Sequence, residues 1–431
     1  MNKAYLIFII GIFFLNLFGI TQNKNYPHYD IKLKINPSSH EIWVKGKLKI
    51  ESGQLKNDKL TFYLYKDLKI NEFSINGKNT AVTDTNKSDL SFIPLAHKIS
   101  FNLGDDFQKS KVLEIKFDYQ GELGKLPKFE TNKIDTIWTE LGLYYPWFPF
   151  NPKDILFYTY NVSVESVPGY KIFGIGKIEE QNNKTLITSN VPTNDIVICL
   201  AKNIKTYTVN LGKNKLRLFH QNLDDSLIID VTNNISAIVN NYKKWFGNKD
   251  MDVSFIKAQR KNGGGYARIG GIVVGGFNSD DYYSDIEENT RYFAHELAHL
   301  WWFKAETNTW EDWLNESFAE YSSLLILRTL FGQNTYNNSL QKKIETIKDS
   351  PVIWDFDRNK AQYQDIRTVL YDKGPVLLSE LEQDIGKKNF MNFCNKLVER
   401  NVSRSTELLE TLRICAGDSV SVSFENKLKT R

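Results

Sequence analysis

Hydrophobic and polar residues alternate along the first half of the chain, from Tyr29 to about Lys205. This period of two residues predicts β-strands that each have one buried face. Gly, Asn, Asp and Pro interrupt the alternating runs, as expected at turns. The runs are "YDIKLKI", "HEIWVKGKLKIES", "KLTFYLY", "VLEIKFDYQG" and "LFYTYNVSVESV". We therefore expect an all-β domain over residues 23–205, built as a β-sandwich or a saddle-like sheet.

Near residue 206 the pattern changes to a mixture of strands and helices. Residues 215–221 and 251–259 are predicted strands, and the helix between them ends at Gly247. A glycine-rich loop then runs into a further strand, and from Asp285 onwards the apolar positions follow the helical period. The chain is therefore predicted to be an α+β protein. Its all-β N-terminal domain is followed by a mostly helical domain over residues 206–431.

The first 22 residues have a different composition from the rest of the chain. Lys3 precedes an apolar run over residues 4–20, and the chain turns polar from Thr21. A basic start, an apolar stretch and small residues near a cleavage point are typical of a secretory signal. Residues 1–22 are therefore predicted as a signal peptide of an exported, periplasmic or extracellular protein. The alternative is an uncleaved membrane anchor, because the run approaches the roughly 20 residues that a spanning helix needs.

Charge and cysteine content exclude two classes of protein. The formal net charge is +4 and no basic run is interleaved with aromatic residues, so we expect no nucleic-acid partner. No later segment is long and apolar enough to span a bilayer. Three cysteines do not make a disulfide framework, and the sequence leaves open whether Cys394 and Cys415 pair. Cys199 lies in a predicted buried strand, where a thiol is an ordinary apolar residue.

The motif "HELAH" carries the first candidate chemistry. His295 and His299 are four residues apart, so on a helix both imidazoles lie on one face and can share one zinc ion. Glu296 lies between them and is close enough to act as a general base on water. Two histidines on a helix are otherwise more often structural.

A catalytic zinc ion of this kind needs a third protein ligand and one open position. The motif "WLNESFAE" offers Glu316, with Glu320 one helical turn later on the same face. We predict Glu316 as the third ligand and Glu320 as the group that orients a ligating histidine. The plainer interpretation of these two residues, taken alone, is a solvated acidic face.

Together these motifs resemble the gluzincin aminopeptidases of the aminopeptidase N and leukotriene A4 hydrolase type, the M1 family. The resemblance implies a β domain followed by a thermolysin-like catalytic domain that holds one zinc ion per chain. It implies His295, His299 and Glu316 as zinc ligands and Glu296 as the residue that activates water. The segment "YDKG" resembles the family's Y-x-K-G and implies that Tyr371 donates to the tetrahedral oxyanion. Without that resemblance, Tyr371 would be an ordinary aromatic residue at a helix start.

Two departures from the family concern length. Sixteen residues separate His299 from Glu316, where the family usually has eighteen, so a shorter connecting loop is expected. Only 57 residues follow Gly374, so the family's large C-terminal helical domain is expected to be missing from this sequence. We therefore expect a more open cleft, unless a second subunit or another protein covers it.

The third departure concerns the substrate's amino end. The family's G-A-M-E-N segment corresponds to "GGYAR", where Gly264 and Gly265 suit an edge strand on which a peptide lies close. Arg268 stands where the family has its amine-binding Glu, and Glu140 stands where the family has a Gln facing the amine. We expect Glu140 to pair with Arg268 and to take over the amine contact. The competing interpretation is a glycine-rich bulge without a role in substrate binding.

Three functions follow from these residues. A zinc-dependent aminopeptidase acting on peptides is the first. An endopeptidase, or a peptidase that selects another substrate end, is the second, because the amine-binding position has changed. A catalytically silent peptide-binding protein that keeps the fold is the third. Glu296 and Tyr371 argue against the third, since binding alone needs neither.

Overall fold

A computed structural model of the chain describes residues 26–430, except residues 56–58, 80–81, 85–87, 91–92, 104–109, 124–132, 260–263, 308 and 359. The predicted signal peptide, residues 1–22, lies outside the described residues, so export stays a prediction. Within the described part of the chain, no helix is long and apolar enough to cross a membrane.

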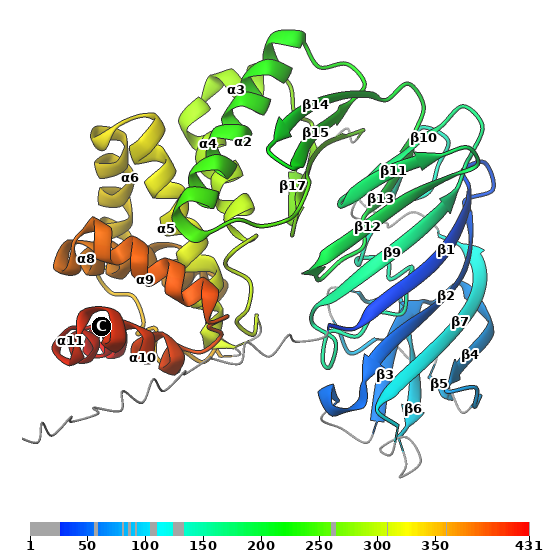
Figure 1. Cartoon of the computed structure of the whole chain (residues 1–431), viewed down its shortest axis with the longest axis horizontal. Helices are drawn as coiled ribbons and strands as arrows, with labels where there is room; N and C mark the ends of the chain where they lie inside the picture. Colours follow the sequence, from blue (N-terminus) through cyan, green and yellow to red (C-terminus); the bar gives the residue numbers. More distant parts are fainter. Residues whose placement is uncertain are drawn as a thin grey trace, which may run out of the picture.

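A β-rich lobe and a helical lobe lie side by side, with a small sheet between them (Figure 1). The β-rich lobe is built from a seven-stranded sheet and two three-stranded sheets. The order of the large sheet is β11-β12-β9-β1-β2-β7-β4, in which β1 pairs with β2 antiparallel and with β9 parallel. Its strands are β1 (His28–Asn36), β2 (Glu41–Glu51), β4 (Leu68–Ile75), β7 (Val112–Glu122), β9 (Tyr158–Glu165), β11 (Lys177–Gln181) and β12 (Lys184–Thr193).

The two small sheets complete this lobe with the orders β3-β6-β5 and β10-β13-β8. Their strands are β3 (Lys59–Tyr65), β5 (Val82–Asp84), β6 (Ala96–Asn102), β8 (Trp138–Leu141), β10 (Lys171–Gly174) and β13 (Ile198–Ala201). Side chains on the strands alternate as predicted: Tyr29, Ile31, Leu33 and Ile35 of β1 are all buried in the core of this lobe. The predicted all-β N-terminal region is confirmed.

A five-stranded sheet begins at β14 and lies between the lobes. The predicted domain boundary at residue 206 falls inside that strand. The sheet order is β14-β15-β16-β18-β17, which leaves β17 at one edge. Its strands are β14 (Lys205–Leu211), β15 (Asn214–His220), β16 (Val253–Ala258), β17 (Gly264–Arg268) and β18 (Gly271–Gly275).

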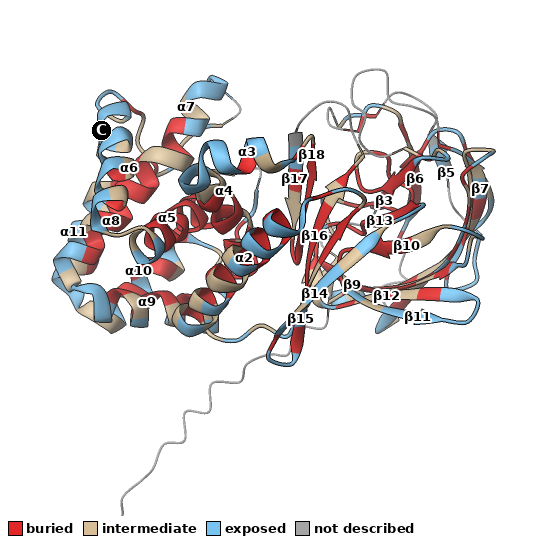
Figure 2. Ribbon diagram, turned by 90° about the horizontal axis from the view of Figure 1, so that it is seen from above, coloured by how far each residue is buried: buried red, intermediate tan, exposed pale blue. Residues whose placement is uncertain are grey.

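Helices form the rest of the chain and confirm the predicted helical region. Figure 2 shows buried residues concentrated in α4, α5 and β16. The α-helices are α2 (Asp225–Phe246), α3 (Ser279–Ser284), α4 (Ile286–Ala298), α5 (Trp313–Leu330), α6 (Gln333–Thr346), α7 (Tyr363–Arg367), α8 (Gly374–Ile385), α9 (Lys387–Glu399), α10 (Ser405–Ala416) and α11 (Asp418–Lys429). Short 3₁₀ turns cover Ser52–Gln54 and Trp310–Asp312, and Thr368–Lys373 is a π-helix.

Three hydrophobic clusters hold these layers together. One fills the β-rich lobe and one lies between the helices and the five-stranded sheet. The third contains residues of the β-rich lobe and of the five-stranded sheet, such as Phe173 of β10, whose ring stacks on Phe219 of β15 with centroids 4.9 Å apart. This third cluster, which we call the mixed cluster, fixes the five-stranded sheet against the β-rich lobe. Cys199 belongs to it and is buried, and no disulfide forms among the described cysteines, so Cys394 and Cys415 do not pair here.

Candidate metal centre

Helix α4 brings the two histidines of "HELAH" together. Its first turn is capped by Asp285, whose side chain accepts from the Glu288 amide at 2.9 Å. His295 lies within the helix and His299 is the C-cap residue, still in helical conformation. The ring centroids of His295 and His299 are 5.0 Å apart. The predicted grouping of both imidazoles on one face is therefore present.

The helix itself ends earlier than its sequence pattern predicts. Apolar periodicity continues to about residue 305, but α4 stops at Ala298. The next residues pack inward instead: the Trp301 indole N–H donates to the Gly247 carbonyl and the Trp302 indole N–H to the Ser322 hydroxyl, at 2.9 and 3.0 Å. Burial and hydrogen bonding of the two tryptophans outweigh the extension of the helix by further turns.

Asn315 holds the loop that connects the two motifs. Its side-chain amide accepts from the Ala305 amide and donates to the Ala305 carbonyl, at 3.1 and 3.0 Å. The same side chain donates to Asp312 at 2.9 Å. The loop after α4 is thereby held on the first turn of α5, so the sixteen-residue spacing still presents Glu316 to the histidines.

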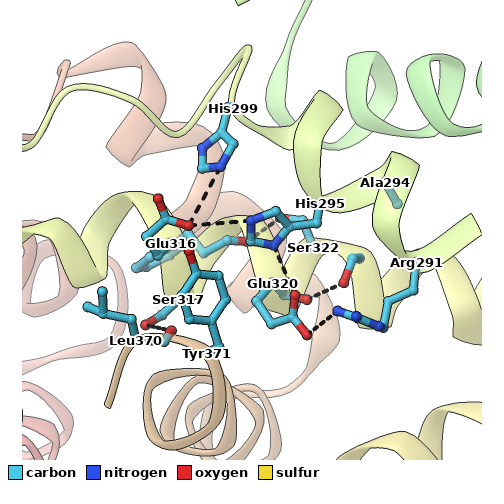
Figure 3. Close-up of polar contacts among 12 residues, drawn as sticks. Arg291, Ala294, His295, His299, Glu316, Ser317, Glu320, Ser322, Leu370 and Tyr371 are labelled. Atoms are coloured by element: carbon cyan, nitrogen blue, oxygen red, sulfur yellow. Dashed lines mark hydrogen bonds and ion pairs between the residues drawn. The ribbon is translucent and has the colours of Figure 1, made fainter. Parts of the chain in front are cut away.

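The three candidate ligands converge on a small space (Figure 3). One side-chain atom from each of His295, His299 and Glu316 lies within 4.8 Å of the other two. Glu316 Oε2 is 3.3 Å from His295 Nε2 and 3.7 Å from His299 Nε2. That oxygen is buried and accepts no hydrogen bond from the described residues. A buried carboxylate oxygen without a donor, facing two imidazole nitrogens, is what a shared cation satisfies.

The other nitrogen of each imidazole is already used. His295 Nδ1 donates to Glu320 Oε2 at 2.9 Å, and His299 Nδ1 donates to the Trp302 carbonyl at 3.0 Å. A proton on Nδ1 leaves the Nε2 lone pair of each ring free to bind a metal. Two His nitrogens and one carboxylate oxygen are a donor set that zinc accepts, with room for a fourth ligand. The residues present therefore fit zinc.

Charge around the site favours a bound cation. Burial alone would lower the pKa of His295, but the carboxylates of Glu316 and Glu320 raise that pKa to about 10. The same negative potential that favours a proton on His295 favours a metal ion. Burial would raise the pKa of Glu320, but the cations around it, Lys343 first, lower that pKa far below its usual range. Glu320 is thus an ionised partner for His295, in the position predicted from the sequence.

Tyr371 reaches this centre from the π-helix Thr368–Lys373. Its ring lies 5.5 Å from the His295 ring, and its hydroxyl points toward Glu316. Burial first, and then the charge of Glu316, raise the pKa of Tyr371, so the phenol stays a donor at neutral pH. The sequence pattern did not predict the π-helix, a distortion often found at functional sites.

Close packing fixes the π-helix on α5. The Ser317 hydroxyl donates to the Leu370 carbonyl at 2.6 Å. Gly374 follows the π-helix, and a Cβ atom there would lie 1.9 Å from Ser317 Oγ. Only a residue without a side chain allows this approach, which gives the glycine of "YDKG" a physical reason. Glu296 is half-buried on α4, and its charge also acts on Tyr371.

The residues predicted to bind the substrate lie on β17 and beside it. Gly264 and Gly265 are on this edge strand, which packs against α4. Arg268 ends the strand, and its Nε donates to Asp195 Oδ2 at 2.7 Å. The Arg268 guanidinium also lies over the rings of Tyr144 and Tyr266, 5.3 and 4.6 Å from their centroids. The carboxylate found on Arg268 is therefore Asp195, where the sequence suggested Glu140.

Glu140 is enclosed instead of facing a cleft. It is 0% exposed. Its Oε1 accepts from the Tyr266 hydroxyl and its Oε2 from the Trp138 indole, both at 2.9 Å. Asp195 is buried and in direct contact with the partly buried Arg268, which the one-dimensional sequence could not show. A contact between Glu140 and a substrate amine thus requires Tyr266 to turn away.

Sequence reasoning missed two cations of the site. Arg291 Nη1 and Lys343 Nζ both bind Glu320 Oε1, at 2.6 and 2.7 Å. Arg291 stands one turn before His295 on the same helix, and this spacing is a signal that could have found it. Nothing in the sequence places Lys343, which comes from α6.

Comparison with known proteins agrees with this geometry. The peptidase family M1 domain matches residues 278–422, a range that contains the three candidate ligands, Glu296 and Tyr371. The chain carries an M1 peptidase domain. Endoplasmic reticulum aminopeptidase 2 of Bos taurus is 27% identical to the chain over 150 residues, which are 31% of the chain and 16% of that protein. Leucine aminopeptidase 2-1 of Meyerozyma guilliermondii is 35% identical over 120 residues, 25% of the chain and 20% of that protein. The chain therefore matches these relatives over a small part of their own length.

Solved structures show the same fold around the M1 domain. The M1 zinc metallopeptidase of Deinococcus radiodurans has a TM-score of 0.69 at 16% identity, covering 94% of this chain and 95% of that one. Native leukotriene A4 hydrolase of Saccharomyces cerevisiae has a TM-score of 0.64 at 18% identity, covering 94% of this chain and 67% of that one. At these identities the likeness concerns the fold. It extends beyond the M1 domain to the β-rich lobe, which holds Glu140.

Proposed function

We propose that the chain is a zinc-dependent aminopeptidase that hydrolyses peptide bonds. One observation carries the proposal: two imidazole Nε2 atoms and a buried carboxylate oxygen converge beside a general base and a phenol donor. The aminopeptidase names of the relatives support the choice of peptides as substrates. A silent binding protein would need neither Glu296 nor Tyr371.

The side chains divide the reaction between them. Zinc, when bound by His295, His299 and Glu316, would supply Lewis-acid chemistry and make water more acidic. Glu296 takes a proton from the attacking water and passes it to the leaving amine. Tyr371 donates a hydrogen bond from its phenol to the carbonyl oxygen as negative charge develops there. The backbone of β17 offers the edge along which an extended peptide can lie.

Zinc binding is tested directly on purified protein. We expect about one zinc ion per chain by elemental analysis, because three protein ligands make one site. His299→Ala should lose most of the metal, since two ligands remain. His97→Ala, in β6 of the β-rich lobe, is the matched control and should keep it. A His299→Ala protein that holds zinc as tightly as wild type would contradict the ligand assignment.

The free amino end of the substrate is tested with paired peptides. Wild type should cleave a peptide with a free N-terminus at least about tenfold better than its acetylated form, a difference of about 1.4 kcal/mol. Glu140→Gln should reduce that preference, because it removes a negative charge beside β17. Glu165→Gln, at the end of β9, is the control. Equal cleavage of both peptides by wild type would favour the endopeptidase. The Arg268–Asp195 pair is consistent with that alternative, because it places an arginine where the family has its amine-binding Glu.

A further inference from the structure

Lys343 joins two parts of the site, the carboxylate of Glu320 and the backbone of Tyr371. It projects from α6, and its side chain is 12% exposed. Its Nζ binds Glu320 Oε1 at 2.7 Å and donates to the Tyr371 carbonyl at 2.8 Å. A third contact, to Asp372 Oδ1, measures 3.3 Å. One ammonium group therefore touches the carboxylate behind His295 and the backbone of Tyr371.

Arg291 provides a natural comparison. Its Nη1 binds the same Glu320 oxygen at 2.6 Å, and its remaining contacts go to Glu288 on its own helix. Both cations therefore stabilise the buried charge of Glu320, which is 1% exposed. Of the two cations, Lys343 also contacts the π-helix. A comparison of variants at the two positions therefore measures the effect of the Lys343–Tyr371 contact separately from the loss of a cation at Glu320.

The contact between Lys343 and Tyr371 lies in the π-helix. A π-helix is less regular than an α-helix, and its position depends on contacts from outside. Two side chains from other helices bind consecutive carbonyls of this segment: Ser317 binds that of Leu370 and Lys343 that of Tyr371. The Tyr371 ring has to stay over His295 with its hydroxyl at the centre. Displacement of a reacting group by about 1 Å can cost about a hundredfold in rate.

We propose that Lys343 is a positioning residue that holds the Tyr371 phenol in register with the metal-binding histidines. It fixes Glu320, which orients His295, and the Tyr371 backbone at one point, so the oxyanion donor and the ligand move together. This inference rests on the proposed function, since it assigns Lys343 to the reaction proposed above. It is distinct from a general structural role, because it predicts which kinetic step suffers.

The experiment compares Lys343→Met with Arg291→Met in zinc-loaded protein. Both variants remove one cation from Glu320, so both should weaken zinc binding to a similar extent in a chelator competition. Lys343→Met should lower kcat about tenfold to a hundredfold more than Arg291→Met, with KM nearly unchanged. It should also weaken binding of a phosphinic peptide, whose tetrahedral phosphorus carries an oxygen where the oxyanion forms. In a Tyr371→Phe background the excess loss should vanish, because the group that Lys343 positions is gone.

Other outcomes separate the two proposals. Equal kcat losses for Lys343→Met and Arg291→Met, or an excess that persists with Tyr371→Phe, would overturn the role of Lys343. If Lys343→Met does not fold, Lys343→Arg is the second variant. It keeps a positive charge beside Glu320 but places its donors at different positions relative to the Tyr371 carbonyl. It should keep zinc affinity and still lower kcat, and an unchanged kcat would reject the inference. A wild type that binds zinc and hydrolyses no peptide would reject the proposed function, and phosphinic-peptide affinity would still compare the variants.

Discussion

Glu296→Gln should keep the metal and lose hydrolysis by a factor of about 10² to 10⁴. The substitution preserves the size of the side chain and its place on α4, between the two histidines. It removes a base and no ligand, because the three converging ligand atoms belong to His295, His299 and Glu316. Without the carboxylate, no base accepts the proton of the attacking water and no acid protonates the leaving amine. Initial rates on a fluorogenic aminoacyl substrate, with zinc measured on the same sample, check this.

Glu287→Gln is the matched control for that experiment. Glu287 is exposed in the first turn of the same helix, so the same chemical change there should leave the rate intact. Near-normal hydrolysis by Glu296→Gln would mean that another group moves the proton. A variant that loses zinc together with activity would instead place Glu296 among the ligands.

Tyr371→Phe should cost about 10² to 10³ in kcat, or roughly 2.7 to 4 kcal/mol of barrier. It removes one hydroxyl and little volume, so the π-helix and its packing on Ser317 stay in place. The phenol donates to charge that exists only in the transition state, and the loss should therefore spare KM. Steady-state kinetics on one peptide series separates the two parameters.

Tyr363→Phe controls for the loss of a tyrosine hydroxyl close in sequence. Tyr363 lies on α7 and is 73% exposed, so its hydroxyl has no place at the centre. Its substitution should leave both constants unchanged. A Tyr371→Phe enzyme that changes only in KM would move Tyr371 from the oxyanion to the substrate pocket.

Local patterns were sufficient to predict much of the fold and the three residues that converge at the candidate metal centre. Strands β1 and β7 of the β-rich lobe alternate between buried and more exposed residues, which burial on one face imposes. His295 and His299 are near neighbours in sequence, so helical periodicity alone brings them together. Glu316 and Glu320 lie on the next predicted helix, and only the packing of α4 on α5 had to be assumed.

Features that depend on distant contacts escaped prediction. The π-helix around Tyr371 is contacted by Ser317, 53 residues from its partner Leu370, and by Lys343, 28 residues from Tyr371. The pairing of Arg268 with Asp195 spans 73 residues and two lobes. No periodic pattern encodes such contacts, because they depend on how complete layers dock. The early end of α4 is a third example, set by where two indoles find partners.

The mixed cluster has a consequence for how the gene can be divided or recombined. A gene fragment that encoded only the helical lobe and its sheet would leave Phe219, Ile256 and Val273 without the apolar surface that covers them. It would also leave Arg268 as a partly buried charge without Asp195, a loss of about 3 to 5 kcal/mol for pairs of this kind. Recombination between homologous genes should therefore exchange the two lobes together, and natural chimaeras joined near residue 205 should be rare. The two lobes should therefore be inherited as one unit, although the candidate ligands all come from one of them.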